Sequence, residues 1–454
     1  MKIIFFINIA MLIVCMSCSN DFLELKPDKK LIIPSKLEDY QALLDEADLM
    51  NRMTAWIEEA QADDYYISTA GWQAISWSSV DQNAYIWATD IYGGTISTIE
   101  WNRPYSVIYR ANVVLDGMEQ VDRQTNPAQY DDIVAQALFF RAWHTFRQAL
   151  VFAPAYEFNK DNQLVLGIPL RLHASLNEVT VRASLEETFQ QVLSDLQRAE
   201  GLFRSVESEF KTRPSQISCW ALLSRVYLYM QNYEKAEHYA ALALDNFSND
   251  LIDLSTWNLS PSFPFTRFNQ EVLFHCAAGT PTAMNASRLT VDSILYASYA
   301  QEDYRRQAFF RQVSGRPGFR GSYDGSAIFF NGLTIAECYL TVAECLVRKG
   351  DAQSGLSLLS TLLQHRIANF TPLRINESED PLKVVLEERR KEMLFKGVRW
   401  LDLKRLNLDP RTAVTIYREI GGQRYSLNPN SKNYTLPLPP EVIKMSGVEQ
   451  NQRD

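Results

Sequence analysis

The spacing of large and small residues over 220–243 constrains the fold of this chain more than any other feature. Large side chains recur with the period of one helix face, and small ones follow at the same period: Trp220, Leu223, Tyr227, Ala236, Ala240 and Ala243. This is the tetratricopeptide spacing, in which small residues let the second helix of a pair approach the first closely. Residues 339–359 repeat the design around the turn at Gly350-Asp351. The chain is therefore predicted to contain packed helix pairs.

Further helical patterns lie on both sides of these segments, at 101–122, 129–152, 184–203 and 379–406. Residues 250–335 differ, because they are rich in proline, glycine, serine and phenylalanine, which favours loops and short strands. We expect a mainly α protein whose body is built from helix pairs, with long loops and short strands covering one face. Loops on a rigid scaffold are where binding sites usually lie.

The N-terminus has the character of an export signal. Lys2 gives it a positive start, and Ile3 to Met16 form an apolar run shorter than the roughly 20 residues of a membrane-spanning helix. Ser17-Cys18 matches a bacterial lipoprotein cleavage site, which predicts Cys18 as the acylated first residue of the mature chain. Acyl chains hold a protein to a membrane because each buried methylene contributes about 0.8 kcal/mol. The alternative is an ordinary secretory signal with an incidental cysteine.

Composition excludes several classes of function. The formal net charge of −9 argues against binding to nucleic acid or to anionic lipid. The five histidines lack metal-ligand spacing, so neither a metal nor a cofactor is expected. No G-x-S-x-G, H-E-x-x-H or phosphate-binding glycine loop is present, which predicts that the chain is not an enzyme. The cysteines of the body form no C-x-x-C motif and are expected to be buried free thiols: Cys219, Cys276, Cys338 and Cys345.

A series of short motifs runs in order along nearly the whole chain. Its members include Asp21-Phe-Leu-Glu24, Trp101-Asn-x-Pro-Tyr105, Ala137-Leu-Phe-Phe-Arg-Ala142, Gly167-Ile-Pro-Leu-Arg171, Glu388-Arg-Arg-Lys-Glu392, Arg399-Trp-Leu-Asp-Leu-Lys-Arg405 and Gln450-Asn451. Together they resemble the SusD/RagB family, the lipoproteins that sit on outer-membrane nutrient transporters of Bacteroidetes. The final Gln-Asn is followed by Gln-Arg-Asp, whereas the family often ends in Pro-Gly-Tyr.

The resemblance implies a domain organisation and a role. It implies a signal peptide over 1–17, a lipidated tether over 18–30, and one SusD-like domain over 31–454. Helix pairs are then expected at about 101–152, 184–247, 332–369 and 379–406, and a loop-rich ligand face at about 53–100 and 250–335. The protein would be anchored in the outer membrane by the lipid on Cys18 and face outward. Its expected partner is a SusC-like TonB-dependent transporter, which it closes like a lid during uptake of an oligomeric nutrient.

Segment 53–102 is the strongest candidate for a ligand platform. It holds five of the nine tryptophans and no lysine or arginine. Aromatic faces stack on sugar rings or peptide side chains, and nearby amides can form hydrogen bonds with them. The expected ligand residues, here and in the loop region, are Trp72, Gln73, Trp77, Asn83, Tyr92, Tyr296, Phe319 and Tyr323. For each of these aromatic residues the alternative is a place in the core, as expected for Trp101 and Tyr105.

Three charged motifs have competing interpretations. Asp63-Asp64 is expected to cap a turn or helix, and a ligand or ion site is the alternative. Arg316 and Arg320 flank glycines, so they either meet a carboxylate of the ligand or lie in a solvated turn. Glu387-Glu388 precede three basic residues on a predicted helix, which favours ion pairing over acid–base catalysis.

The identity of the ligand is the open question. The absence of cations from 53–102 argues against a polyanion and favours a neutral glycan. Uptake of peptides in the same role is the first alternative. A periplasm-facing helical-repeat scaffold that binds only protein is the second.

Overall fold

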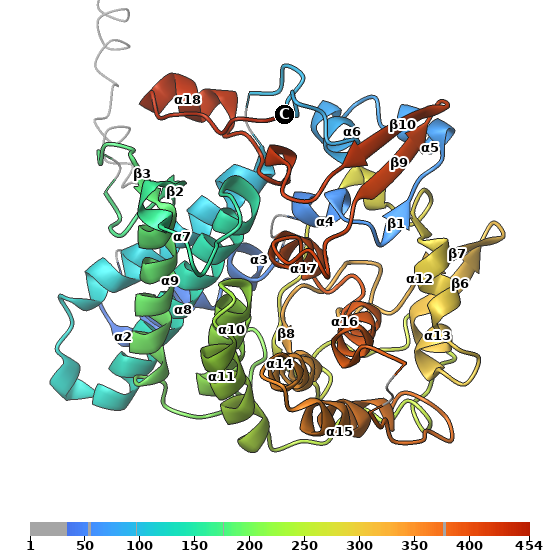
Figure 1. Ribbon diagram of the computed structural model, residues 1–454. Coiled ribbons are helices and arrows are strands. Elements are labelled where there is room, and N and C mark those ends of the chain that lie inside the picture. The colour runs from blue at the N-terminus through green and yellow to red at the C-terminus, as the bar shows by residue number, and fades with distance from the viewer. Residues whose placement is uncertain (1–33, 53–55, 97, 176, 376–377) are drawn as a thin grey trace, which may run out of the picture.

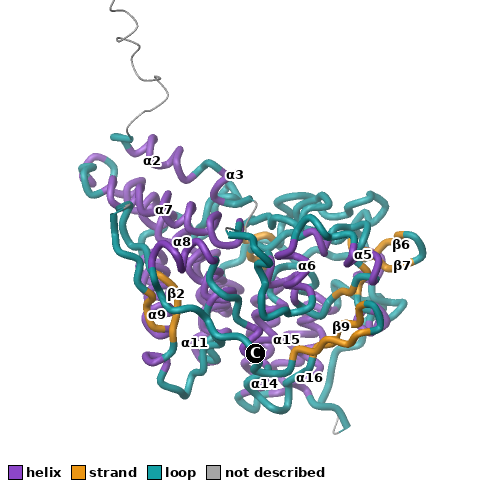
Figure 2. Tube along the Cα trace, turned by 90° about the horizontal axis from the view of Figure 1, so that it is seen from above, coloured by secondary structure: helices purple, strands orange, loops and turns teal. Residues whose placement is uncertain are grey.

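The computed structural model describes residues 34–52, 56–96, 98–175, 177–375 and 378–454. The predicted signal peptide, Cys18 and the tether lie outside the described residues. Long helices fill the left half of the molecule, and loops with short strands prevail in the right half (Figures 1 and 2). Within the described ranges, no helix is long and apolar enough to cross a membrane.

Packed helix pairs form the body, as the spacing of large and small residues predicts. The helices are α7 (Ile99–Met118), α8 (Pro127–Phe152), α9 (Leu185–Glu200), α10 (Gln216–Tyr229), α11 (Tyr233–Asp245), α14 (Ile335–Arg348) and α15 (Ala352–Leu363). Consecutive members pack together as α7 on α8, α10 on α11, and α14 on α15, and α11 lies beside α14. A methyl group at Gly355 would lie 2.7 Å from the side chain of Val347, so only glycine permits the close approach of α15 to α14.

Shorter helices carry the rest of the chain. They are α2 (Leu37–Leu44), α3 (Ala47–Met50), α4 (Ile57–Gln61), α5 (Thr69–Gln73), α6 (Ser79–Tyr85), α12 (Ser293–Ser298), α13 (Tyr304–Phe309), α16 (Pro381–Glu392), α17 (Arg399–Leu406) and α18 (Pro440–Ser446). Single 3-10 turns are η2 (Arg123–Thr125), η3 (Asn162–Leu164), η4 (Thr282–Met284) and η5 (Lys432–Tyr434). The predicted helical segment 379–406 is thus two helices, α16 and α17, separated by a turn at Gly397 whose φ of +78° favours glycine.

Among the described residues, the strands form five two-stranded antiparallel sheets. The pairs are β1 (Tyr65–Tyr66) with β5 (Thr290–Val291), β2 (Leu166–Pro169) with β3 (Arg182–Ser184), β4 (Val272–Phe274) with β8 (Leu333–Thr334), β6 (Phe310–Val313) with β7 (Arg316–Phe319), and β9 (Ile416–Ile420) with β10 (Gln423–Leu427). The β1–β5 pair brings segment 53–102 against segment 250–335, since Tyr66 lies opposite Thr290. The two predicted halves of the loop-rich face are therefore neighbours.

Two large apolar clusters form the core, one in each half of the molecule. One fills the space between the long helices, and the other lies under the loops around Trp56, Tyr65 and Phe309. The four predicted thiols are buried and free, as expected.

A buried ionic layer runs along α16 and α17, where the two halves meet. Glu388 binds Arg305 and Lys391, which confirms ion pairing for this carboxylate. Asp63 and Asp64 belong to the same layer: Arg399 lies 2.6 Å from Asp63, and Arg390 lies 2.8 Å from Asp64. This pair of aspartates therefore anchors the chain at the start of the loop-rich face.

The C-terminus closes the fold over the end of α8. Asn451 donates hydrogen bonds to the carbonyl oxygens of Phe152 and Leu436, at 2.8 and 2.7 Å. Arg453 belongs to the Gln-Arg-Asp ending that this chain has in place of Pro-Gly-Tyr. It donates to the carbonyl oxygens of Thr435 and Ala88, at 2.7 and 3.0 Å. The C-terminal segment is thus held against the rest of the fold through Arg453.

Candidate functional site

Trp77 is the most exposed aromatic side chain among the predicted ligand residues. It lies in the turn between α5 and α6, and 67% of its surface is accessible. The turn itself is fixed, because Ile75 is fully buried and Ser78 accepts a hydrogen bond from the backbone of Asp81 at the start of α6. An anchored backbone and a solvent-exposed ring are what a stacking platform requires.

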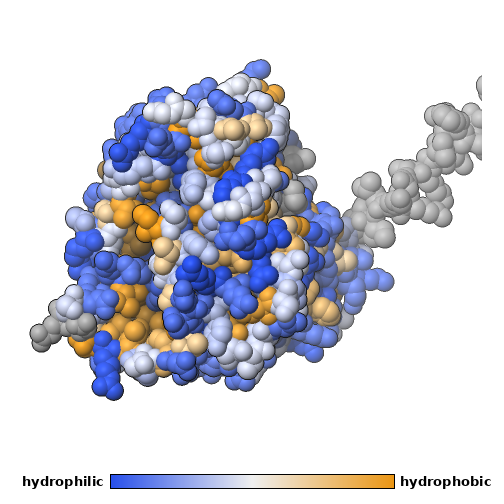
Figure 3. All heavy atoms as spheres, turned by 90° about the vertical axis from the view of Figure 1, so that its right-hand side faces the viewer, coloured by the Kyte–Doolittle hydropathy of each residue, from blue (hydrophilic) through white to orange (hydrophobic). Residues whose placement is uncertain are grey.

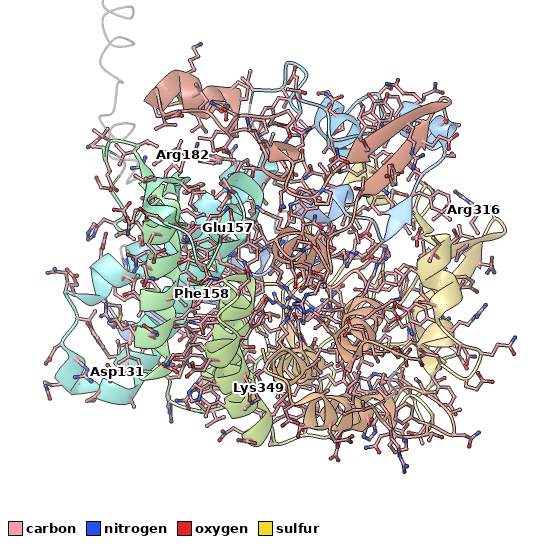
Figure 4. All side chains as sticks on the ribbon, viewed as in Figure 1. Asp131, Glu157, Phe158, Arg182, Arg316 and Lys349 are labelled. Carbon is pink, nitrogen blue, oxygen red and sulfur yellow. The ribbon has the colours of Figure 1, made fainter. Side chains whose placement is uncertain are left out.

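Arg288 lies over the ring of Trp77. Its guanidinium carbon is 5.1 Å from the ring centre, which is within the range of a cation–π interaction. The backbone amide of Thr282 donates to Asp81 of α6 at 2.7 Å, and this bond holds the loop of Arg288 against α6. Arg316 of β7 secures the same loop, since it donates to the carbonyl oxygen of Ser287 at 3.2 Å. Figure 4 places Arg316 at the outer edge of this half of the molecule.

Trp72 and the predicted amides support the platform. The indole nitrogen of Trp72 donates to the carbonyl oxygen of Gln82 at 2.9 Å, and the Gln82 amide donates back to the carbonyl oxygen of Trp72 at 3.1 Å. These reciprocal bonds fasten α5 to α6 and leave Trp72 half-buried. Asn83 is also half-buried and donates to the carbonyl oxygen of Ile91 at 3.3 Å, whereas Gln73 is exposed.

Tyr296 and Phe319 lie on the same half of the molecule and are half-buried. Arg306 covers the ring of Tyr296, with 4.8 Å between guanidinium carbon and ring centre. Phe319 packs edge-on against Phe395 at 4.9 Å between ring centres, so much of its surface is used within the fold.

Tyr92 and Tyr323 are core residues in this structure. Tyr92 is 5% exposed and its hydroxyl donates to the carbonyl oxygen of Pro437 at 2.6 Å. Tyr323 is 2% exposed and donates to Glu271 at 2.8 Å. Because both rings are buried, neither residue can stack on a ligand in this structure.

The charged motifs of the loop face serve the fold. Asp63 and Asp64 receive their hydrogen bonds from arginines, in place of the capping expected from the sequence. Arg316 and Arg320 donate to backbone carbonyl oxygens of neighbouring loops. Both arginines therefore hold loops in place, and neither lies in a merely solvated turn.

Two grooves lie away from Trp77. One of about 650 Å³ runs between α7 and α18, lined by Trp101, Tyr105 and Met445. Another of about 600 Å³ lies beside the C-terminal segment and is lined by Lys404 and Gln450. Trp77 lines neither of these grooves. Figure 3, which faces the right-hand side of Figure 1, shows apolar groups interspersed with hydrophilic ones on this side of the molecule.

Two residues of this surface were not predicted from the sequence, Arg288 and Arg306. Each lies in a loop-rich region and belongs to no sequence motif. The aromatic ring that it contacts becomes known only from the folded structure. The sole sequence signal is the number of arginines between 288 and 320 in an otherwise acidic chain.

Comparisons with known proteins agree with this architecture. A family model described as "Starch-binding associating with outer membrane" matches residues 21–228, and one described as "SusD family" matches residues 321–452. The SusD-like protein P2 of Formosa agariphila is 23% identical over 425 residues, covering 77% of this chain and 79% of that protein.

Solved structures show the same fold. A SusD superfamily protein from Bacteroides thetaiotaomicron superposes with a TM-score of 0.74 at 19% identity, covering 92% of this chain and all (100%) of that one. A SusD-like protein described as laminarin-binding superposes with a TM-score of 0.64 at 19% identity, covering 91% of this chain and 97% of that one. The chain belongs to the SusD/RagB family, whose members are binding proteins and not enzymes.

Proposed function

We propose that this protein captures an oligosaccharide on the surface around Trp77 and passes it to an outer-membrane transporter. The observation that carries the proposal is the exposed Trp77 ring, held in a turn that is fixed on both sides. The apolar face of a sugar ring can stack on such an indole, while amides and guanidinium groups nearby bind its hydroxyls. The name of the laminarin-binding relative supports a glycan as the ligand.

An open surface suits a polymer better than a closed pocket does. A long glycan can lie across α5, α6, α12 and the β6–β7 hairpin without having to thread into a cavity. Gln73, four residues before Trp77, is exposed and can donate hydrogen bonds to such a ligand. Tyr296 and Phe319 offer partial ring surface farther along the same half of the molecule.

The role at the membrane is the second part of the proposal. Cys18 is the proposed lipidation site, the segment after it is the tether, and a SusC-like TonB-dependent transporter is the proposed partner that the protein closes. The lipoprotein-type sequence at Ser17-Cys18 and the outer-membrane association in the name of the matching family model support it. Protease treatment of intact cells tests the outward orientation: we expect cleavage, and full protection would favour a periplasm-facing scaffold.

Glycan binding is tested by calorimetric titration of a polysaccharide panel into the wild type, Trp77→Ala and Phe210→Ala. Phe210 is a matched control, because it is 52% exposed and also lies under an arginine, Arg213 at 5.0 Å, outside the proposed site. We expect Trp77→Ala to weaken binding about tenfold, the effect of about 1.4 kcal/mol, and Phe210→Ala to leave it unchanged. Equal behaviour of both variants, or binding of peptides alone, would refute the proposal.

A further inference from the structure

Among the arginines that lie over aromatic rings in the loop-rich half are Arg288, Arg306 and Arg311. Arg288 covers Trp77 at 5.1 Å, Arg306 covers Tyr296 at 4.8 Å, and Arg311 covers Phe263 at 5.5 Å. Within the described parts of the chain, none of the three forms an ion pair with a carboxylate. Two of these rings, Trp77 and Tyr296, belong to the surface proposed to bind the ligand.

Two buried arginines, Arg305 and Arg366, behave differently. Arg305, the immediate neighbour of Arg306, lies 2.8 Å from Asp303 and 2.7 Å from Glu388. Arg366 binds Glu271 at 2.7 Å in the same ionic layer. Arg305 and Arg366 thus have acidic partners, whereas Arg288, Arg306 and Arg311 have none among the described residues.

Two neighbouring arginines of this half also form no ion pair with a described carboxylate. Arg316 and Arg320 also donate only to backbone oxygens and, for Arg316, to the hydroxyl of Thr290 at 3.1 Å, as far as the described residues show. Burial, and then the charge of Arg311, lower the pKa of Arg320, as expected where like charges lie near one another. A guanidinium group without a carboxylate partner can attract an anion even though the whole chain carries a net charge of −9.

Arg288 is the member best placed to bind a ligand. It is half-buried beside an exposed indole, and the described chain accepts no hydrogen bond from its guanidinium group. Its N–H groups are thus available, and guanidinium recognises carboxylate and sulfate oxygens through paired, charge-assisted hydrogen bonds. Arg288 also lies between the two ranges matched by the family models, 21–228 and 321–452.

We propose that the oligosaccharide is anionic: Trp77 stacks on a sugar ring while Arg288 binds a carboxylate or sulfate on the same or the adjacent residue. The inference rests on the proposed function and changes the ligand class suggested by the cation-free segment 53–102. Arg306 beside Tyr296 offers a second anion contact for a longer polymer. An acidic peptide would satisfy the arginines, but it lacks the flat, repeating ring faces that suit the exposed indole.

The test compares polysaccharides in matched charged and neutral forms: homogalacturonan against its methyl ester, and sulfated against desulfated carrageenan. The proteins are the wild type, Arg288→Gln and Arg204→Gln, the last removing the same charge from an exposed site that follows α9 on the other side of the molecule. We expect the wild type to prefer a charged form, and Arg288→Gln to weaken binding of that form about tenfold or more while sparing the neutral form. Arg204→Gln should change neither, and added salt should weaken only the charged form.

Several results would overturn the inference. Equal binding of both forms, or equal loss of both in Arg288→Gln, would mean that Arg288 only supports the Trp77 ring. Binding of polyglutamate with the same dependence on Arg288 would assign the site to acidic peptides. Neutral glycans that depend on Trp77 but not on Arg288 would leave the proposed function standing and remove only the anionic ligand. No binding of any polysaccharide would reject both.

Discussion

Replacing Glu344 by glutamine tests the ionic layer that joins α14 to α17. The Glu344 side chain is fully buried and accepts hydrogen bonds from Arg405 at 2.6 and 2.7 Å and from Arg348 at 2.8 Å. Burial alone would raise the pKa of this carboxyl, but the charge and hydrogen bonds of Arg405 outweigh it. They hold the pKa at about 2, below the ordinary value of 4.5.

The magnitude follows from the difference between these two pKa values. A difference of about 2.5, at about 1.36 kcal/mol for each pH unit, gives about 3.4 kcal/mol of stabilisation. Breaking a buried ion pair typically costs about 3–5 kcal/mol, which agrees. Because the folded pKa is the lower one, the stabilisation is complete above pH 4.5 and is lost as the pH falls toward 2.

Urea unfolding of Glu344→Gln and the wild type at pH 7, 5 and 3 measures the effect. We expect the variant to be less stable by about 3 kcal/mol at pH 7, and the difference to shrink at pH 3. Glu387→Gln is the control, because that side chain is 61% exposed and lies 3.9 Å from Lys383. Its effect should stay within about 0.5 kcal/mol. A difference for Glu344→Gln that is absent at pH 7, or constant from pH 7 to 3, would refute the reasoning.

Three further predictions concern the fold. Burial raises the pKa of Glu59 to about 8, so wild-type stability should fall as the pH rises from 4.5 to 8. The gain in Tm of Glu59→Gln should therefore be larger at pH 8 than at pH 5, and an equal gain at both would contradict this. Asn451→Ala leaves the carbonyl oxygens of Phe152 and Leu436 without their donor and should cost about 2 kcal/mol in denaturant unfolding, whereas an unchanged midpoint would argue against the C-terminal contact. Burial raises the pKa of Cys276 to about 12, so this thiol and the other three of the body should resist iodoacetamide in the native protein and react in urea; native labelling, read by peptide mass mapping, would show that they are accessible.

The helix pairs were predictable because their signal is local. Ala236, Ala240 and Ala243 repeat within one helix and are all buried, so periodicity alone identifies the packed face. The exposure of single aromatic residues carries no such local signal. Trp77 and Tyr92 both lie in glycine- and serine-rich sequence, yet Tyr92 is buried because its hydroxyl reaches Pro437, far along the chain.

Arg288, which lies beside the platform, was missed for a related reason. Segment 53–102 contains no cation, and from this the sequence favours a neutral ligand. The β1–β5 pairing and the bond between Thr282 and Asp81 bring a distant loop to the platform, and that loop carries Arg288. Composition within a window cannot describe a surface made by two segments about 200 residues apart in sequence.

Hydrogen–deuterium exchange with and without a bound glycan tests the central claim most directly. For the polysaccharide that binds most tightly in the titrations, we predict slower exchange in 69–85 and 285–320, the segments that surround Trp77 and Arg288. Exchange in α10, α11, α14 and α15 should not change. Protection confined to those helices, or to the groove between α7 and α18, would contradict the proposed site.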